Sequence, residues 1–247
     1  MQPLRKGQYI ARIAEGAADL HRAQSLRHLC FHGAAAGPGR DADAFDARCT
    51  HILVEDMQTG ALLCCYRLLR LTGAQIGQSY SAQYYDLSRL AGFAAPMVEM
   101  GRFCIHPACR DPDILRLAWG AMTRFVDLAG AELLIGCASF SGTDAAPYQE
   151  AFAVLKQAHL APPHWGPAVK APQVVRFAHL LKDHAPDQRR AMATMPPLLR
   201  TYLAMGGWVS DHAVVDPVMN TLHVFTGVEI RAIPAARARA LRMVAAG

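Results

Sequence analysis

The chain has 247 residues, of which 52% are hydrophobic, and it carries 25 Lys and Arg against 20 Asp and Glu. This length and composition are typical of a globular protein with one substantial domain and exclude a largely disordered chain. The formal net charge of +5 includes no long basic run, which speaks against nucleic-acid binding and is compatible with docking an acidic protein or anionic lipid headgroups.

Neither a membrane span nor a secretory signal is expected. No segment reaches the roughly 18 uninterrupted apolar residues of a spanning helix, and the N-terminus lacks the apolar core of a signal peptide. We therefore expect a cytoplasmic protein. The seven cysteines form no CxxC pair, and the eleven histidines show no HExxH or other ligand spacing, so we expect reduced thiols and no metal site.

The first part of the chain predicts a strand at residues 9–13 and a helix at 15–31, where apolar residues recur at helical spacing. Residues 32–45 are rich in Gly, Ala and Asp, which is typical of a surface loop. Two strands follow at 51–55 and 61–71, joined by a turn that contains Asp, Thr and Gly.

The middle of the chain is arranged about a central strand, with a short helix before it and two helices and a strand after it. Residues 72–95 predict a short helix between loops, and an apolar strand begins at Met97. Asp111 and Pro112 have helix-start chemistry, and the apolar stripe after them ends near Gly130. A strand at 133–140 and a helix to about residue 159 complete a mixed, mostly antiparallel sheet flanked by helices, an α/β (α+β) fold.

A proline-rich connector at 161–172 precedes the last third of the chain. There we expect a strand at 174–181, a helix at 196–205, a hairpin formed by 209–215 and 223–230, and a basic helix at 235–244. That helix is suited to rest on a membrane surface, with a solvated helix as the favoured alternative. We expect a core of residues 1–165 and a C-terminal extension of residues 166–247 packed on it as one structural unit.

Two charged residues, Glu99 and Arg102, interrupt the apolar central strand, with Gly101 between them. Charges in such a strand are costly unless they pair or take part in chemistry. Strict alternation sends the two side chains to opposite faces, but a bulge at Gly101 would turn both toward one cleft. A buried ion pair that only fixes register is the alternative.

Arg67 lies on an apolar strand face and therefore needs a carboxylate partner, for which Asp46 and Glu99 are the candidates. His51 is a second candidate proton acceptor. A strand histidine that is bonded to a backbone group is the favoured interpretation of it.

Six segments, in order along nearly the whole chain, carry a family resemblance: DAFDARCTHILV (43–54), CYRLL (65–69), VEMGRFCIHPACR (98–110), LLIGCASF (133–140), HLAP (159–162) and MPPLLRTYLAMGGWVSDHAVVDPVMNT (195–221). They resemble the GNAT N-acyltransferase superfamily, and within it the bacterial ornithine lipid family of ornithine-acyl-ACP N-acyltransferases.

The first half is also similar to acyl-homoserine lactone synthases. The positions that match that family are Arg27, Phe31, Asp46, Arg67, Glu99 and Arg102. Its pocket tryptophan and second loop aspartate are Gly37 and Cys49 here, which argues against an S-adenosylmethionine substrate.

The donor loop also departs from acetyl-CoA-dependent GNAT enzymes, whose glycine-rich loop cradles a pyrophosphate. Residues 109–114 contain no glycine, Pro112 removes an amide donor, and two aspartates would repel the anion. The resemblance therefore implies acyl-carrier protein (ACP), with its phosphopantetheine thioester, as donor and no bound cofactor. Arg110 and Arg116 are candidate contacts for the phosphate or for the acidic carrier surface.

The resemblance implies transfer of a long 3-hydroxylated acyl chain from acyl-ACP to the α-amine of ornithine, giving lyso-ornithine lipid. In this reading Glu99 accepts the amine proton, an amide near Gly101 binds the oxyanion, and Arg102 and Arg67 hold carboxylates. Asp46 would meet the side-chain ammonium of ornithine.

Candidate acyl-chain contacts are Phe31, Phe103, Leu134 and Ile135, although plain core is the favoured interpretation of them. Ser139 is a candidate substrate contact and not a nucleophile, because GxSxG is absent. The alternatives are the same reaction on another amino acid such as glutamine, an acyl-homoserine lactone synthase, and a catalytically silent ACP-binding or lipid-binding module. The expected partners are ACP, the amino acid and, peripherally, the cytoplasmic face of the inner membrane, but not nucleic acid.

Overall fold

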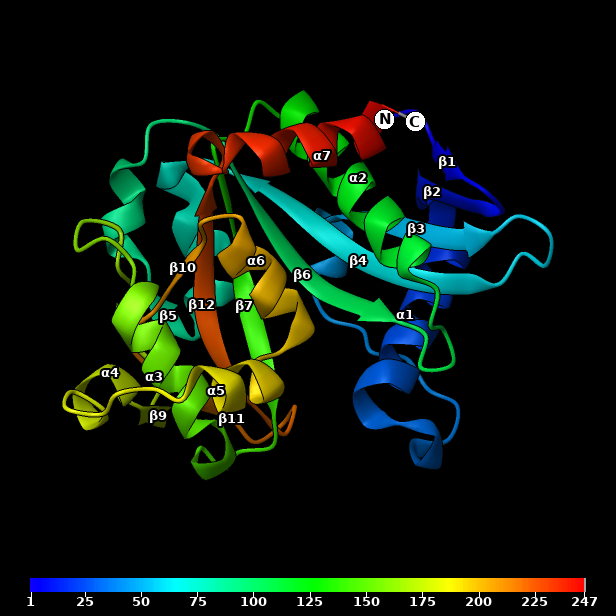
Figure 1. The fold of residues 1–247 in the computed structure, drawn as a ribbon. Coiled ribbons are helices and arrows are strands. Elements are labelled where there is room, and N and C mark those ends of the chain that lie inside the picture. Colours follow the sequence, from blue (N-terminus) through cyan, green and yellow to red (C-terminus); the bar gives the residue numbers. More distant parts are fainter. Residues whose placement is uncertain (247) are drawn as a thin grey trace. The chain divides into compact units, whose positions relative to one another are not determined.

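A computed structural model describes residues 1–246, which fall into two compact units. The first unit combines Met1–Arg70, Met100–Ala131 and the C-terminal segment from Ala235, and the second combines Leu71–Glu99 with Glu132–Pro234. Figure 1 shows the mixed, mostly antiparallel strands and flanking helices that the sequence predicted. The expected extension divides between the units, because its strands belong to the second and its last helix to the first.

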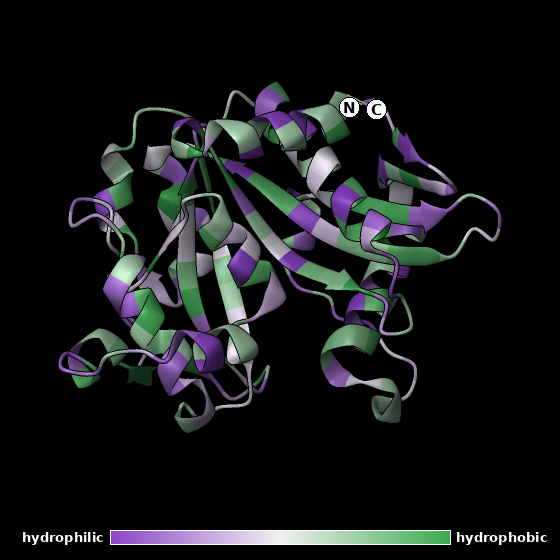
Figure 2. Cartoon of the chain, viewed as in Figure 1, coloured by the Kyte–Doolittle hydropathy of each residue, from purple (hydrophilic) through white to green (hydrophobic). Residues whose placement is uncertain are grey.

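The first unit has strands in the order β1 (Leu4–Lys6), β2 (Tyr9–Ile13), β3 (Thr50–Asp56), β4 (Leu62–Leu71) and β6 (Met97–Ile105), of which Leu71 and the start of β6 up to Glu99 belong to the second unit. The pairs β1–β2, β2–β3 and β3–β4 are antiparallel. The predicted turn between β3 and β4 is confirmed, and the side chain of Asp56 accepts hydrogen bonds from the amides of Gln58 and Thr59. Hydrophobic residues predominate on these strands, as Figure 2 shows for both units.

Three helices accompany these strands: α1 (Gly16–His32), α2 (Pro112–Leu128) and α7 (Ala235–Ala246). Helix α2 begins as predicted, because Asp111 caps it by accepting a hydrogen bond from the amide of Asp113 and proline occupies its first position. The terminal helix α7 packs along α2 (Figure 1), where Arg124 donates to the carbonyl of Ala245 at 2.8 Å. One side of α7 is therefore covered by protein, and its arginines are exposed.

The second unit has strands in the order β7 (Leu133–Ser141), β12 (Thr221–Glu229), β11 (Ala213–Asp216) and β9 (Val174–Val175), with β10 (Trp208–Val209) also paired to β12. Strands β7 and β12 are antiparallel over nine residue pairs. Between β10 and β11, Ser210 donates its hydroxyl to the carbonyl of His212 and accepts from the amide of Phe225. That serine side chain satisfies backbone groups where the strand is interrupted.

The core of the second unit lies between one face of β7 and β12 and the helices α3 (Gln149–Ala158), α4 (Phe177–Leu180), α5 (Gln188–Thr194) and α6 (Pro197–Ala204). The rings of Phe152 and Phe177 stack there at 4.9 Å. The predicted strand at 174–181 is wrong after Val175, because Phe177 is buried in this core as the start of a helix. Helix α5 was not predicted.

Residues 72–95 also differ from the predicted short helix. They form the 3-10 turns η3 (Gly73–Gln78), η4 (Ser81–Gln83) and η5 (Ser88–Gly92), and β5 (Tyr85–Asp86) pairs with β8 (Ala168–Val169). The remaining 3-10 turns are η1 (Ala34–Ala36), η2 (Asp46–Arg48), η6 (Ala146–Tyr148) and η7 (Ile230–Ala232). In residues 1–246, no helix has both the length and the apolar character needed to cross a membrane.

Candidate active site

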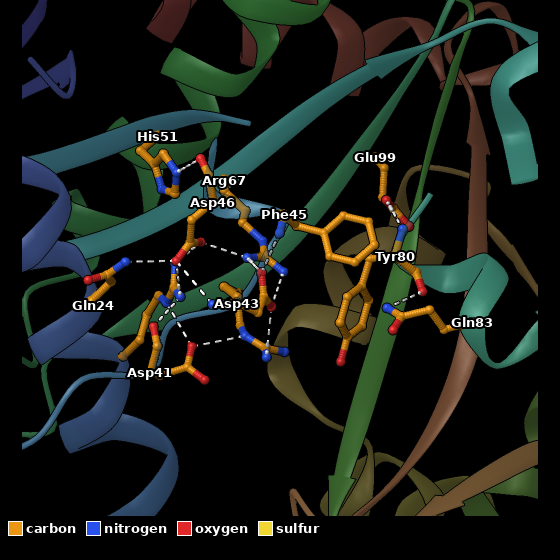
Figure 3. A network of polar contacts seen from close by, with 12 residues as sticks. Gln24, Asp41, Asp43, Phe45, Asp46, His51, Arg67, Tyr80, Gln83 and Glu99 are labelled. Atoms are coloured by element: carbon orange, nitrogen blue, oxygen red, sulfur yellow. Dashed lines mark hydrogen bonds and ion pairs between the residues drawn. The ribbon is translucent and has the colours of Figure 1, made fainter. Parts of the chain in front are cut away.

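The first unit contains a buried group of three arginines and three aspartates, which we call the arginine–aspartate cluster: Arg27, Arg67, Arg102, Asp41, Asp43 and Asp46. Its members come from α1, β4, β6 and the loop before β3. Figure 3 shows the three aspartates converging on Arg67 and the neighbouring guanidinium groups. Three positive and three negative side chains make the cluster formally neutral, which is how charges are tolerated away from water.

Arg27 fixes the loop before β3 to helix α1. Its side chain is 1% exposed and donates from Nε to Asp41 Oδ2 at 2.8 Å. Its two terminal nitrogens donate to the two carboxylate oxygens of Asp46 at 2.8 and 3.0 Å. This bidentate geometry is the strong form of an arginine–carboxylate pair. The second half of the predicted surface loop is therefore anchored in the interior, which corrects the expectation of a surface segment.

Arg67 binds two carboxylates. Its Nη1 donates to Asp46 Oδ1 at 2.7 Å and to Asp43 Oδ1 at 2.5 Å, and its Nη2 donates to Asp43 Oδ2 at 2.8 Å. The predicted partnership with Asp46 is confirmed, whereas Asp43 was not expected. The side chain of Asp43 is 25% exposed against 5% for Asp46. Asp43 is thus the more accessible of the two carboxylates that Arg67 holds.

Arg102 has an unusual backbone conformation, with φ of 55° in the left-handed region that non-glycine residues rarely adopt. Such a conformation costs about 1–3 kcal/mol and persists where its surroundings impose it. Here the guanidinium donates to Asp41 at 3.0 Å and to Asp43 at 3.3 Å, and it lies 5.9 Å from the ring centroid of Phe31. The backbone irregularity that the sequence placed at Gly101 therefore lies one residue further along β6.

The ion pairs keep the cluster charged. Burial by itself would raise the pKa of Asp46, but hydrogen bonds from Arg27, Gln24 and Arg67 outweigh it and hold that pKa below its usual range. The pKa of Asp43 is lowered in the same way by Arg67. Burial would lower the pKa of Arg67, yet its bonds to Asp43 and Asp46 raise it.

His51 lies beside the cluster on β3 and is bonded to the backbone. Its Nε2 lies 2.9 Å from the carbonyl oxygen of Asp46, and burial lowers its pKa. A neutral imidazole therefore donates to this carbonyl, which confirms the favoured interpretation of His51 as a strand histidine satisfied by a backbone group.

Glu99 belongs to the second unit, where the start of turn η4 holds its carboxylate. The residue is 4% exposed. Its Oε2 accepts from the amide of Tyr80 at 2.7 Å, and its Oε1 accepts from the amide and the hydroxyl of Ser81 at 2.8 and 2.6 Å. Figure 3 shows the bond to Tyr80, whose carbonyl accepts from Gln83. The hydroxyl of Ser81 also lies 3.3 Å from the sulfur of Cys137 on β7.

The remaining predicted substrate-contact residues lie partly in the first unit and partly in the second. In the first unit, Phe103 stacks on Tyr66 with centroids 5.4 Å apart. In the second unit, Leu134 and Ile135 are buried, whereas Ser139 is exposed and lies opposite His223 of β12.

Arg110 and Arg116 are both exposed at the surface of the first unit. Arg110 donates to backbone carbonyls of its own loop, and Arg116 forms an ion pair with Asp113 at 2.7 Å.

Sequence reasoning missed Asp41, Asp43, Tyr80 and Ser81. Charge balance was the available indication for the first two, because Arg67 and Arg102 were expected in apolar strands with only Asp46 and Glu99 named as acidic residues near them. Tyr80 and Ser81 act mainly through backbone amides, which every residue but proline carries. No residue-type pattern therefore singles them out.

Comparisons with known proteins identify the relatives of this chain. Residues 26–120 match the acetyltransferase (GNAT) domain family. The chain is 34% identical over 239 residues to the L-ornithine N(alpha)-acyltransferase of Rhodobacter capsulatus, with 91% of each chain covered. It is 31% identical to the protein of the same name from Brucella abortus, covering 93% of this chain and 87% of that one.

A solved structure supports the fold. FeeM, an N-acyl amino acid synthase from uncultured soil microbes, superposes with a TM-score of 0.54 at 10% sequence identity, covering 94% of this chain and 99% of that chain. The sequence relationship extends over nearly the full length of the Rhodobacter protein. This chain is an N-acyltransferase that belongs to the L-ornithine N(alpha)-acyltransferase family.

Proposed function

We propose that this chain transfers a long 3-hydroxylated acyl group from acyl-ACP to the α-amine of ornithine, giving lyso-ornithine lipid. The observation that carries the proposal is the 34% identity to an L-ornithine N(alpha)-acyltransferase over 91% of both chains. In the reaction the amine nitrogen attacks the thioester carbonyl, the carbon–sulfur bond breaks, and the carrier thiol leaves with a proton while an amide forms.

Glu99 is the proposed proton acceptor. An α-amine is largely protonated at neutral pH, so a carboxylate must take its proton directly or through water before attack. Three hydrogen bonds from Tyr80 and Ser81 fix the orientation of the Glu99 carboxylate. Such fixing favours catalysis, because a base that is already oriented needs no reorganisation when the amine arrives.

The proposed oxyanion donor is a backbone amide of β6 near Gly101. The left-handed φ of Arg102 turns the adjoining peptide groups away from a regular strand pattern, which supports an amide available to a substrate oxygen. Removing one oxyanion donor typically raises the barrier by roughly 3–4 kcal/mol.

Asp43 is the better candidate for the side-chain ammonium of ornithine. We expected this role for Asp46, but its two oxygens accept from Arg27, Arg67 and Gln24. Both oxygens of Asp43 also accept, from Arg67, Arg102 and the amide of Phe45, but Asp43 is the more exposed of the two carboxylates and is therefore the more accessible to substrate. Those two arginines are the proposed clamp for the α-carboxylate of the substrate.

The proposed donor is acyl-ACP rather than acyl-CoA. Asp111 occupies the cap of α2 and already accepts from the amide of Asp113, so the start of this helix presents a carboxylate where a pyrophosphate cradle would present free amides. Arg110 and Arg116 are exposed nearby in the chain. They are suited to contact an acidic carrier surface.

The test is to incubate the pure protein with 3-hydroxyacyl-ACP and either ornithine or glutamine, and to read the mass of the product. N-acylornithine as the main product supports the proposal. N-acylglutamine would move the acceptor to another amino acid. A lactone formed only when S-adenosylmethionine is supplied would replace the proposal by the synthase alternative.

A further inference from the structure

His223 on β12 carries a buried ring nitrogen without a hydrogen-bond partner. The residue is 4% exposed, and among the described residues no group donates to or accepts from its Nε2. Buried polar atoms in native proteins are nearly always hydrogen-bonded, so an orphaned one indicates a water or a ligand group that completes it. The chemistry of this nitrogen limits what that group can be.

The neighbouring tyrosine determines the tautomer of His223. The hydroxyl of Tyr85 lies 2.7 Å from the carbonyl oxygen of His223 and 3.2 Å from its Nδ1. A phenol has a single proton, and the carbonyl can only accept, so Tyr85 donates to the carbonyl. Nδ1 must then carry the hydrogen and donate to the phenol oxygen.

The remaining nitrogen, Nε2, is consequently a bare acceptor in the neutral ring. Burial lowers the pKa of His223 to about 4, which keeps the ring neutral at physiological pH. The group that completes the site must therefore be a hydrogen-bond donor. A carbonyl or ether oxygen does not qualify, because it can only accept.

His223 lies on the same face of the sheet as Ser139 and Cys137, and Cys137 is linked through Ser81 to Glu99. His223 lies directly opposite Ser139, and Phe225 lies opposite Cys137; directly opposed residues project from the same face. Cys137 contacts the hydroxyl of Ser81, which donates to Glu99.

Two residues along a strand span roughly 7 Å, so His223 lies a short distance beyond the Cys137 side chain on the same face. Ser139 opposite it is exposed, whereas the ring of His223 packs against the rings of Tyr84 and Tyr85, with centroids 4.9 and 5.6 Å away. The third carbon of an acyl chain lies two carbons beyond the thioester carbonyl, so its hydroxyl is the donor group of the chain nearest to the reacting centre.

We propose that Nε2 of His223 accepts a hydrogen bond from the 3-hydroxyl group of the acyl chain and so selects hydroxylated donors. The inference rests on the proposed function for the identity of the acyl chain. A 3-hydroxyl both reaches this depth and donates. An unsubstituted chain leaves Nε2 unpaired, and a 3-oxo chain places a second acceptor against it.

The experiment compares kcat/KM for three ACP thioesters of one chain length, 3-hydroxyacyl, unsubstituted acyl and 3-oxoacyl, with ornithine as acceptor. The wild type should prefer the hydroxylated donor by about tenfold to a hundredfold over each of the others. His223→Phe should lose this preference, which is a ratio of kcat/KM values and is therefore read independently of any common change in rate. His223→Gln, whose amide oxygen can accept, should retain part of it.

His212 supplies the matched control. It is 1% exposed, its Nε2 also lacks a partner among the described residues, and its Nδ1 lies 2.6 Å from Asp211. It lies outside the β7–β12 ladder and its ring is 5.2 Å from that of Tyr85, so His212→Gln reports the effect of altering a neighbour of Tyr85 and should leave the donor preference unchanged. A loss of preference in His212→Gln equal to that in His223→Gln would overturn the assignment.

A binding measurement separates this inference from the proposed function. Calorimetry with nonhydrolysable 3-hydroxyacyl and acyl pantetheine analogues needs no acceptor. Tighter binding of the hydroxylated analogue that His223→Phe abolishes supports the inference even if ornithine proves not to be the acceptor. Equal wild-type affinities for the two analogues, or an equal loss for both in His223→Phe, would show a histidine completed by water and would overturn it.

Discussion

The arginines of the arginine–aspartate cluster, of which Arg27 and Arg67 are buried and Arg102 is half-buried, make the fold depend on individual carboxylates. Removing one partner of a buried ion pair leaves an uncompensated charge, which typically costs about 3–5 kcal/mol. Asp46 touches Arg27 and Arg67, and its side chain is only 5% exposed. Asp43 pairs with Arg67 and Arg102 but is 25% exposed. When its carboxylate is removed, water can therefore replace part of the ion pairing of these two arginines.

Asp46→Asn should therefore lower the free energy of unfolding by about 3–5 kcal/mol, and Asp43→Asn by only about 1–2 kcal/mol. Urea unfolding at neutral pH measures both values. Asp43→Asn should in addition raise KM for ornithine without a matching loss of kcat, because Asp43 is the proposed contact for the distal ammonium. Equal destabilisation by the two substitutions would contradict the difference in burial.

Substitution of Glu99 distinguishes a catalytic role of this residue from a purely structural one. In Glu99→Gln the amide must turn its NH2 group toward the amide of Tyr80 or that of Ser81, since both now donate to the carboxylate. Some loss of stability, about 1–3 kcal/mol, is expected from this mismatch. We also expect kcat to fall by about a hundredfold to ten-thousandfold, because the proton acceptor is gone.

Ser81→Ala is the matched control for Glu99→Gln. It removes one of the three hydrogen bonds on the carboxylate and leaves the carboxylate itself, so it should share part of the stability loss with a much smaller fall in kcat. Thermal unfolding and steady-state rates on both variants make the comparison. Near-normal kcat in a folded Glu99→Gln protein would sink the assignment of Glu99 as base.

Among single residues, the sequence identified those that stand out as a charge in an apolar segment or as a match to a family position. Arg27, Asp46, Arg67 and Arg102 could all be singled out as charges in apolar or family-like surroundings. Asp41 and Asp43 could not, because aspartates in a glycine-rich loop are ordinary until three arginines are known to converge on them. A bulge was predicted at Gly101, whereas the left-handed φ lies at Arg102, where the residue type gives no indication of it because glycine is the residue that adopts such conformations without strain.

Among the elements, those with a local start signal were predicted well. Helix α2 begins where Asp111 and Pro112 indicated, and the β3–β4 turn has the expected Asp and Gly chemistry. The segment after Val175 was predicted wrongly as strand, because its apolar residues fit either period and only burial of Phe177 beneath α3 decides for a helix.

The packing of α7 on α2 gives a prediction about an element. A Cβ at Gly120 would lie 2.7 Å from a methyl group of Val244 and 2.9 Å from one of Leu4. A small side chain there requires those flexible side chains to shift, whereas a large one displaces α7. Overpacking of this kind typically costs about 1–3 kcal/mol.

We therefore expect Gly120→Leu to increase hydrogen exchange of the backbone amides of α7 while those of β3 stay protected. Leu128→Gln, at an exposed position of the same helix, is the control and should leave α7 unchanged. Unaltered protection of α7 in Gly120→Leu would mean that the α2–α7 contact does not hold this helix.

For the molecule as a whole, the chain order conceals how residues are grouped. The first unit is assembled from three separate stretches of the chain and the second from two. The predicted boundary near residue 165 was based on the proline-rich connector. The packing of α7 on α2 could not be predicted in this way, because it depends on contacts between residues more than a hundred positions apart in the sequence.

The overall charge leads to the last prediction. With a formal charge of +5 and exposed Arg110 and Arg116, the protein should attract an acidic carrier through fields that salt screens. Raising the ionic strength from about 0.05 to about 0.5 M, which shortens the Debye length to a few ångströms, should raise KM for acyl-ACP several-fold and leave kcat unchanged. Acyl-pantetheine, which lacks the carrier protein, should show no such rise.

Charge reversal localises this effect on the surface. Arg110→Glu should raise KM for acyl-ACP at low salt and flatten its salt dependence, whereas Arg70→Glu, at another exposed position of the first unit, should change both far less. Since association rates respond to the charges nearest the docking surface, equal effects of the two reversals would place the carrier elsewhere. A KM that ignores ionic strength would instead mean that the carrier is bound by apolar or uncharged contacts.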